Sequence, residues 1–367
     1  MSQVAQSYWD TKTPSHDIGQ GRRARLARIA HALGVLPAIQ RVRDARCGGL
    51  RILAYHRILE SAEPSGFAFD PGLISASASA FDVQMGLLKR HYQPTSLAQV
   101  LAMVEEGRPL PARSVVVTFD DGYEDNHRIA LPILQKHGVP ATFFVSTAHI
   151  DTGKPYAYDW LFHMICTAQV AECSIPELRI DEPMPGSIME RRRIATLALY
   201  RLKLLDAQQQ EQLVEQICVM WDIPYRDHDA VCRPMTWNQV RDLHRAGMEI
   251  GSHGANHRML AKLPEALLLR ELSDSREILQ EQVGGDINAI SYPVGGFDAY
   301  DSRVIRTAIE CGYRIGCSYV VGVDRPASGN LMSLRRIPIE RDMDMIWFEA
   351  ILAAPEVFAY QSNHRAG

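Results

Sequence analysis

The 367-residue sequence lacks several features that would place it in a specialised class of protein. It has no C-x-x-C pair, and its seven cysteines are irregularly spaced, so neither a disulfide framework nor a zinc cluster is expected. Its formal net charge of -4 is small and gives no reason to expect nucleic acid as a partner. No run of about eighteen apolar residues occurs, so no membrane span is expected.

The first residues, MSQVAQSYWDTKTPSHD, show no basic stretch followed by an apolar run, which is the pattern of a secretory signal. We therefore expect a cytoplasmic protein. Hydrophobic residues make up 46% of the chain and charged residues 22%, which is typical of a globular protein with a substantial core.

An arginine-rich segment, residues 21–46, lies within an expected N-terminal extension (1–49). Leu26, Ile29, Ala30 and Leu33 recur at helical spacing, so the segment could form an amphipathic helix peripheral to an anionic membrane surface. Alternatively, the helix packs on the rest of the protein and leaves a basic face in solvent. We favour this second interpretation.

Short apolar runs alternate with helical patterns in two parts of the chain. In the first part, strands are expected at 50–56, 114–122 and 141–146, with helices at 79–91, 97–106 and 126–137. In the second part, helices at 236–247, 264–283 and 301–311 each precede a strand, at 248–253, 289–293 and 313–320. Buried, non-alternating strands joined by helices imply parallel pairing in a barrel or open α/β sheet, with the functional site at the carboxyl ends of the strands.

Residues 150–235 do not follow this alternation and are expected to form a mainly helical insertion. The expected main domain spans 50–349, and 350–367 is expected to be a C-terminal tail.

Two adjacent aspartates end the clearest expected strand, SVVVTFDDG (114–122). Carboxylates at the end of a buried strand are costly unless a cation neutralises them, and a metal ion would do so. Adjacency would let one carboxylate bind the ion while the other stays free as a base. Asp-Asp-Gly also suits an ordinary turn, so Asp120 and Asp121 do not decide the matter alone.

Two histidines four residues apart follow another expected strand, in the sequence GSHGANH (251–257). His253 and His257 could face one metal ion as neutral imidazoles, although such pairs are often only surface histidines. Together with the aspartates they favour a metal site, because one carboxylate and two imidazoles form a three-point site with positions open for water.

The order of these motifs, TFDDG, then SHxxxH, then a Tyr-Pro turn, resembles the polysaccharide deacetylases with a NodB-homology domain, carbohydrate esterase family 4. The resemblance covers roughly residues 50–150 and 236–345. It implies a distorted (β/α)7 barrel. It also implies that Asp121, His253 and His257 bind the metal and that Asp120 is the general base.

The general acid departs from the common family pattern, which has a histidine near the C-terminal end of the domain. Here that region reads LMSLRRIPIERD (331–342) and contains none. In motif order the chain is closest to the branch that deacetylates poly-N-acetylglucosamine, which carries the acid on the first strand in a Tyr-His sequence. Tyr55-His56 matches that arrangement, so the resemblance implies His56 as the acid. Alternatively, His56 only braces the mouth of the barrel.

A second departure is the turn ISYPVGG (290–296), which lacks the arginine that holds the base aspartate in many relatives. Arg336 is the candidate that replaces it. Tyr292 is expected to offer a backbone N–H near the oxyanion or its ring to the sugar, with Pro293 as a further substrate or oxyanion position.

We therefore expect a metal-dependent hydrolase that removes the N-acetyl group from an N-acetylhexosamine in a glycan or lipid-linked glycan precursor, as in exopolysaccharide biosynthesis. Two alternatives remain: an amidohydrolase acting on a small non-sugar amide, and a non-catalytic glycan-binding protein. Zinc is the expected ion, although cobalt, nickel or iron would suit the same ligands.

Overall fold

The computed structural model describes residues 21–46, 49–61, 67–205, 207–224, 232–327 and 329–360. Within these ranges the chain divides into two compact units. The smaller unit contains residues 67–70 and 156–224, and the larger contains the other described residues.

Parallel strands close into a barrel in the larger unit. Among the described residues, an eight-stranded sheet has the order β1-β12-β11-β10-β9-β6-β5-β4, and a further pairing of β1 with β5 closes all of these strands except β4 into a ring. The strands of the ring are β1 (Arg51–Tyr55), β5 (Ser114–Phe119), β6 (Ala141–Val145), β9 (Glu249–Ser252), β10 (Ala289–Ser291), β11 (Ile315–Val321) and β12 (Leu334–Pro338). The short strand β4 (Gln93–Pro94) pairs with the start of β5.

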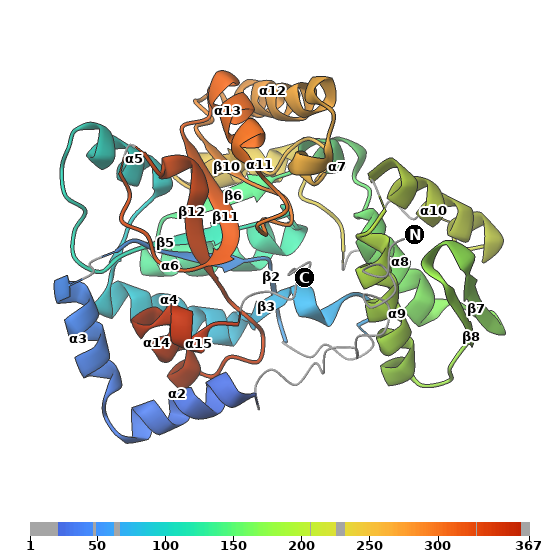
Figure 1. Cartoon of the computed structure of the whole chain (residues 1–367), viewed down its shortest axis with the longest axis horizontal. Coiled ribbons are helices and arrows are strands. Elements are labelled where there is room, and N and C mark those ends of the chain that lie inside the picture. Colours follow the sequence, from blue (N-terminus) through green and yellow to red (C-terminus); the bar gives the residue numbers. More distant parts are fainter. Residues whose placement is uncertain are drawn as a thin grey trace. The chain divides into compact units, whose positions relative to one another are not determined.

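Helices surround this barrel (Figure 1). They are α4 (Ala78–His91), α5 (Leu97–Glu105), α6 (Leu131–His137), α7 (Thr147–Thr152), α11 (Trp237–Arg245), α12 (Glu265–Val283), α13 (Ser302–Glu310), α14 (Met345–Ala353) and α15 (Pro355–Phe358). A π-helical turn (Asn126–Ala130) precedes α6, and the two-stranded sheet of β2 (Arg57–Leu59) and β3 (Ile74–Ser77) lies beyond β1. The expected (β/α)7 barrel is confirmed.

Buried strands explain the unbroken apolar runs of the sequence. Every residue of β1, β5 and β6 is buried, because the barrel interior covers one face of each strand and the surrounding helices cover the other. The rings of Phe119 and Phe143 stack on neighbouring strands with centroids 4.7 Å apart. Capping boxes at Ser96 and Thr236 begin α5 and α11.

The N-terminal helical segment is two helices, α2 (Arg22–Ala32) and α3 (Leu36–Arg46), rather than one. They separate at Gly34, which adopts a positive φ of 65°. Both pack on α14, and α2 also packs on α15. Arg28 pairs with Asp344 at 3.0 Å and Arg43 with Glu356 at 2.7 Å. No helix in the described part of the chain is long and apolar enough to span a bilayer.

The expected boundaries are less accurate than the expected elements. The C-terminal boundary at residue 350 falls inside α14, which packs against the N-terminal helices. The smaller unit begins at residue 156, later than the expected 150, since α7 belongs to the larger unit. It contains α8 (Ala157–Thr167), α9 (Ile188–Leu202) and α10 (Ala207–Met220), as expected, and also an unexpected hairpin of β7 (Glu172–Ile175) and β8 (Ile180–Pro183).

Candidate metal and catalytic site

Three predicted ligands meet at the carboxyl ends of the barrel strands. Asp121 follows β5, and His253 and His257 follow β9. The Nε2 atoms of both histidines lie 3.3 Å from Oδ1 of Asp121, and one ligand atom from each residue lies within 4.8 Å of the others. One carboxylate and two imidazoles at these distances can share a single divalent ion.

Unusual backbone conformations turn the ligands towards one another. Asp121 (φ 72°) and His257 (φ 54°) both lie in the left-handed region, which non-glycine residues rarely adopt. Gly122 follows in the same region, and a Cβ there would come within 2.8 Å of Cγ1 of Val145. Strained backbone of this kind clusters at functional sites, where the surrounding structure maintains it.

A hydrogen bond to the main chain orients His253, and Glu271 holds the loop that carries His257. Nδ1 of His253 lies 2.8 Å from the carbonyl oxygen of Ser291, which can only accept. Nδ1 therefore carries the proton, and the Nε2 lone pair faces Asp121, as metal-binding histidines require. The loop that carries His257 is held by Glu271, a buried residue of α12 that accepts from the backbone and the side chain of Asn256. This donor set fits a metal ion.

Asp120 faces a different cation. Arg336, on β12, donates to both carboxylate oxygens of Asp120, at 2.8 and 2.7 Å, and both side chains are buried. Burial by itself raises the pKa of Asp120, but the Arg336 guanidinium together with His253 and His56 outweighs burial and holds this pKa below its ordinary value. Ser291 adds a hydrogen bond to Asp120 at 3.3 Å. The arrangement keeps Asp120 ionised and fixes its orientation.

Arg336 is fully engaged by the barrel as well as by Asp120. Its Nε donates to the carbonyl oxygen of Ser318 at 2.8 Å. The same two amino groups that donate to Asp120 also donate to the hydroxyls of Thr118 and Ser291. The sequence led us to expect Arg336 beside the base, and in the structure Arg336 pairs with Asp120.

His56 lies immediately after β1, beside the aspartates. The backbone N–H of Asp120 donates to the carbonyl oxygen of Tyr55, which places the ends of β1 and β5 next to each other. Burial lowers the pKa of His56 below its ordinary value, and the carboxylates of Asp121 and Asp120 offset this shift only in part. Its ring meets that of Tyr319 edge to face, with centroids 5.5 Å apart.

The expected roles of Tyr292 are wrong in this structure. Its backbone N–H donates to the carbonyl oxygen of Cys317 at 3.0 Å, so this N–H is not available to an oxyanion. Its ring is fully buried against Tyr300, and its hydroxyl donates to the carbonyl oxygen of Met332, so the ring cannot face a sugar. Pro293 is also buried, and as a proline it has no N–H to donate.

Several residues that support the site were not singled out from the sequence. Ser291 contacts both halves of the site, through its carbonyl oxygen to His253 and its hydroxyl to Asp120. Tyr319 contacts His56 and also lies under Arg336, 5.3 Å from ring centroid to Cζ. Val294, partly exposed after Pro293, has φ 66°, which is an outlier for a β-branched residue. Of these three residues, only Val294 had a local signal in the sequence, because Gly295 and Gly296 directly after it indicate a turn.

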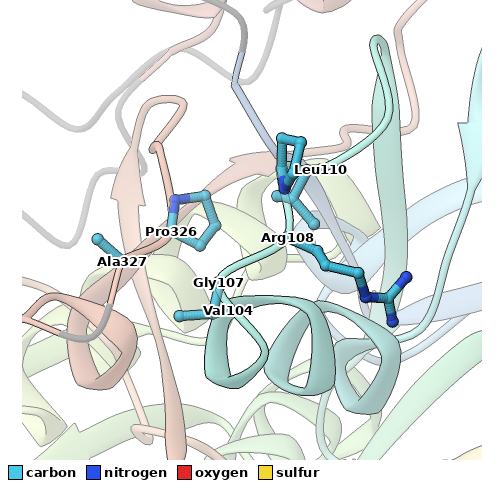
Figure 2. Close-up of a pocket in the computed structure, with 7 residues that line it drawn as sticks. Val104, Gly107, Arg108, Leu110, Pro326 and Ala327 are labelled. Atoms are coloured by element: carbon cyan, nitrogen blue, oxygen red, sulfur yellow. The ribbon is translucent and has the colours of Figure 1, made fainter.

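A separate hollow of about 360 Å³ lies away from this site (Figure 2). Its lining comes from the segments that precede β5 and β12, at the amino ends of those strands, and consists of Val104, Gly107, Arg108, Pro109, Leu110, Pro326 and Ala327. Arg108, its one charged residue, pairs with Glu106. The hollow therefore belongs to the end of the barrel opposite the aspartates and histidines.

The sequence matches the model of a known protein family. The family model described as polysaccharide deacetylase matches residues 107–316, more than half of the chain. The chain belongs to the polysaccharide deacetylase family. The matched range includes Asp120, Asp121, His253 and His257.

Among curated proteins, the chain is similar to the poly-β-1,6-N-acetyl-D-glucosamine N-deacetylases of two bacteria. It is 33% identical over 105 residues to that of Escherichia coli K12, covering 28% of this chain and 15% of the relative. It is also 33% identical over 105 residues to that of Staphylococcus aureus MSSA476, covering 27% of this chain and 36% of the relative. The similarity therefore spans a minor part of each of these relatives.

Solved structures of deacetylases share the barrel fold. The Streptococcus pyogenes deacetylase PplD in complex with acetate has a TM-score of 0.53 at 22% identity, over 81% of this chain and 94% of that one. IcaB from Ammonifex degensii has a TM-score of 0.52 at 18% identity, over 85% of this chain and 98% of that one.

Proposed function

We propose that this polysaccharide deacetylase hydrolyses the N-acetyl group of an N-acetylhexosamine residue in a glycan. The observation that carries the proposal is the pair of adjacent carboxylates with different partners. Asp121 faces two imidazoles at 3.3 Å, and Asp120 is clamped by Arg336 at 2.7–2.8 Å. Metal-assisted hydrolysis of an amide uses both an ion that stabilises negative charge on the carbonyl oxygen and a base that takes a proton from water.

Asp121, His253 and His257 would hold the divalent ion, for which zinc is our first choice and cobalt, nickel and iron are alternatives. When bound, such an ion polarises the acetyl carbonyl and makes water more acidic. The chain contributes the fixed geometry, because Ser291 sets the tautomer of His253 and Glu271 holds the loop that carries His257.

Asp120 acts as the general base in this proposal. Arg336 occupies one lone pair on each carboxylate oxygen and the Ser291 hydroxyl takes the second on Oδ2, so Oδ1 keeps one lone pair for a further hydrogen bond. The carboxylate is therefore oriented by the arginine and can still receive a proton from the attacking water. The same ion pair keeps Asp120 ionised before the reaction starts.

His56 donates a proton to the departing amine. An amine is a poor leaving group unless it is protonated, so amide hydrolysis needs an acid as well as a base. Burial lowers the pKa of His56, and the two aspartates beside it favour the charged form and offset part of that shift. Tyr319 supports the imidazole from one edge.

Membership of the polysaccharide deacetylase family supports a glycan substrate, and the two curated relatives, named for poly-β-1,6-N-acetyl-D-glucosamine, point to N-acetylglucosamine as the sugar. Free N-acetylglucosamine oligomers and lipid-linked precursors both contain the amide that the site would cleave. A small non-sugar amide is the competing substrate class.

Acetate release tests the proposal directly. Purified protein, loaded with zinc, is incubated with N-acetylglucosamine oligomers and with small aliphatic acetamides, each with and without a chelator. We expect chelator-sensitive acetate release from the oligomers alone. Release from the small amides but not from the oligomers would replace the glycan with the competing substrate. No release from either, with the metal bound, would indicate a glycan-binding protein instead.

A further inference from the structure

We propose that α2 and the turn after it form a docking surface for an anionic lipid bilayer. The surface combines an apolar stripe with flanking arginines on the outer side of the helix. The apolar stripe consists of Leu26, Ile29, Leu33 and Val35. This inference concerns where the protein binds and does not depend on the proposed reaction.

α2 turns its large apolar side chains towards solvent and its small ones towards the protein. The helix packs on the barrel unit through Ala24 and Ala27, which are fully buried, while Leu26 is 50% exposed, Ile29 55% and Leu33 71%. Surface helices of globular proteins normally bury their large apolar residues and expose small or polar ones. Single exposed leucines are common, but Leu26 and Ile29 share one face of α2, and the C-cap residue Leu33 continues it four residues later.

The second argument is charge. α2 contains four arginines, one histidine and no acidic residue. Arg28 pairs with Asp344, and Arg23 lies over the ring of Tyr360. Arg22 and Arg25 are exposed, and no acidic partner for either occurs among the described residues.

The placement of these two arginines matches an anionic surface. Arg22 precedes Leu26 by four residues and Arg25 precedes Ile29 by four, so each guanidinium lies one turn from an exposed apolar side chain. Apolar residues that enter the boundary of the acyl chains, with arginines at the level of the phosphates, characterise helices that lie on anionic bilayers. A second copy of this chain would fit the surface poorly, because a two-fold contact would bring the same unneutralised arginines together.

The position of α2 gives the surface a use. Asp344, its partner for Arg28, begins α14, which follows the carboxyl end of β12 after a short loop. Asp121 and His253 also follow the carboxyl ends of their strands. A bilayer bound to α2 would therefore lie beside the end of the barrel that carries the site. In a cytoplasmic protein, this surface would bind the inner leaflet of the cell membrane.

Vesicle sedimentation tests the proposal with the full-length protein. Vesicles of phosphatidylcholine alone are compared with vesicles of phosphatidylcholine and phosphatidylglycerol. We expect binding to the anionic vesicles, little binding to the neutral ones, and a loss on the order of tenfold for Leu26→Ser/Ile29→Ser and again for Arg22→Gln/Arg25→Gln.

Leu269→Ser/Ile309→Ser is the matched control, because Leu269 on α12 and Ile309 on α13 are 48% and 52% exposed on the same unit. This control should bind the anionic vesicles as the parent protein does. Thermal unfolding of each variant checks that the fold is intact. Equal binding by the parent and both α2 variants, or no binding to anionic vesicles, would overturn the proposal. So would lipid-free self-association that Leu26→Ser/Ile29→Ser abolishes, because the stripe would then be an interface between copies.

Discussion

Asp120 and Asp121 are neighbours in the chain, yet they belong to two different electrostatic environments. Asp121, turned by a positive φ, faces His253 and His257, whose ring nitrogens can bind a metal ion. Asp120 faces Arg336, whose charge is permanent. The end of one strand can therefore supply both a metal ligand and a base. An imidazole can share a metal ion with the carboxylate it faces, whereas a guanidinium has no lone pair to bind an ion and stays paired with its carboxylate.

Removing Asp121 should give the largest effect. Asp121→Ala leaves only two imidazoles, so we expect the bound metal to be lost and acetate release to fall by about 10³-fold or more. Metal content after dialysis, measured by mass spectrometry, checks the first expectation, and the acetate assay checks the second. A variant that kept one metal ion per chain would show that the ion binds elsewhere.

Removing Arg336 should damage both stability and rate. Arg336→Met leaves a buried carboxylate without its cation, which typically lowers the free energy of unfolding by about 3–5 kcal/mol. The pKa of Asp120 should rise, because the charge that holds it down is gone, so the acid limb of the pH–rate profile should move to higher pH.

Urea unfolding and a pH–rate profile measure these two effects of Arg336→Met. The double variant Asp120→Asn/Arg336→Met serves as the control, since it removes both charges and should recover part of the lost stability. If the double variant were no more stable than Arg336→Met, the loss would come from packing rather than from the unpaired carboxylate.

His56 should matter for amides more than for activated esters. His56→Ala should lower acetate release from N-acetylglucosamine oligomers by about 10²-fold, because the amine then departs without its acid. Hydrolysis of 4-nitrophenyl acetate, whose leaving group needs no proton, should change little. Equal losses on both substrates would assign His56 to bracing the barrel mouth.

Ser291 should give the smallest effect, even though it contacts both environments. Ser291→Ala removes the hydroxyl bonded to Asp120 and Arg336 but keeps the carbonyl oxygen that accepts from His253. We expect a decrease of about 1 kcal/mol in the free energy of unfolding, a severalfold lower rate, and unchanged metal affinity. Weaker metal binding would mean that the two environments are coupled through this residue.

The barrel could be predicted from local patterns because its strands are short, fully buried and rich in β-formers. Val115, Val116 and Val117 lie in such a run, and β6 repeats it. β12 was missed because Arg335 and Arg336 interrupt its apolar pattern. The buried Arg336 is tolerated only because Asp120, 216 residues earlier in the chain, lies beside it, and a partner so distant leaves no local signal.

The site was predictable to the extent that its groups sit next to strand ends. Asp121, His253 and His257 follow such ends and meet at one ion-sized space. The roles expected for Tyr292 failed because the register of β10 and β11 gives its N–H to Cys317. The membrane question depended on which face of α2 turns outward, and spacing alone cannot assign that face.

The most direct test of the account is the Asp120→Asn protein, measured for metal content and for acetate release together. We expect one bound ion per chain, as in the parent protein, because the metal ligands remain. Acetate release should fall by about 10³-fold, because the base is gone. Full activity, or loss of the metal with the activity, would contradict the division of labour between the two aspartates.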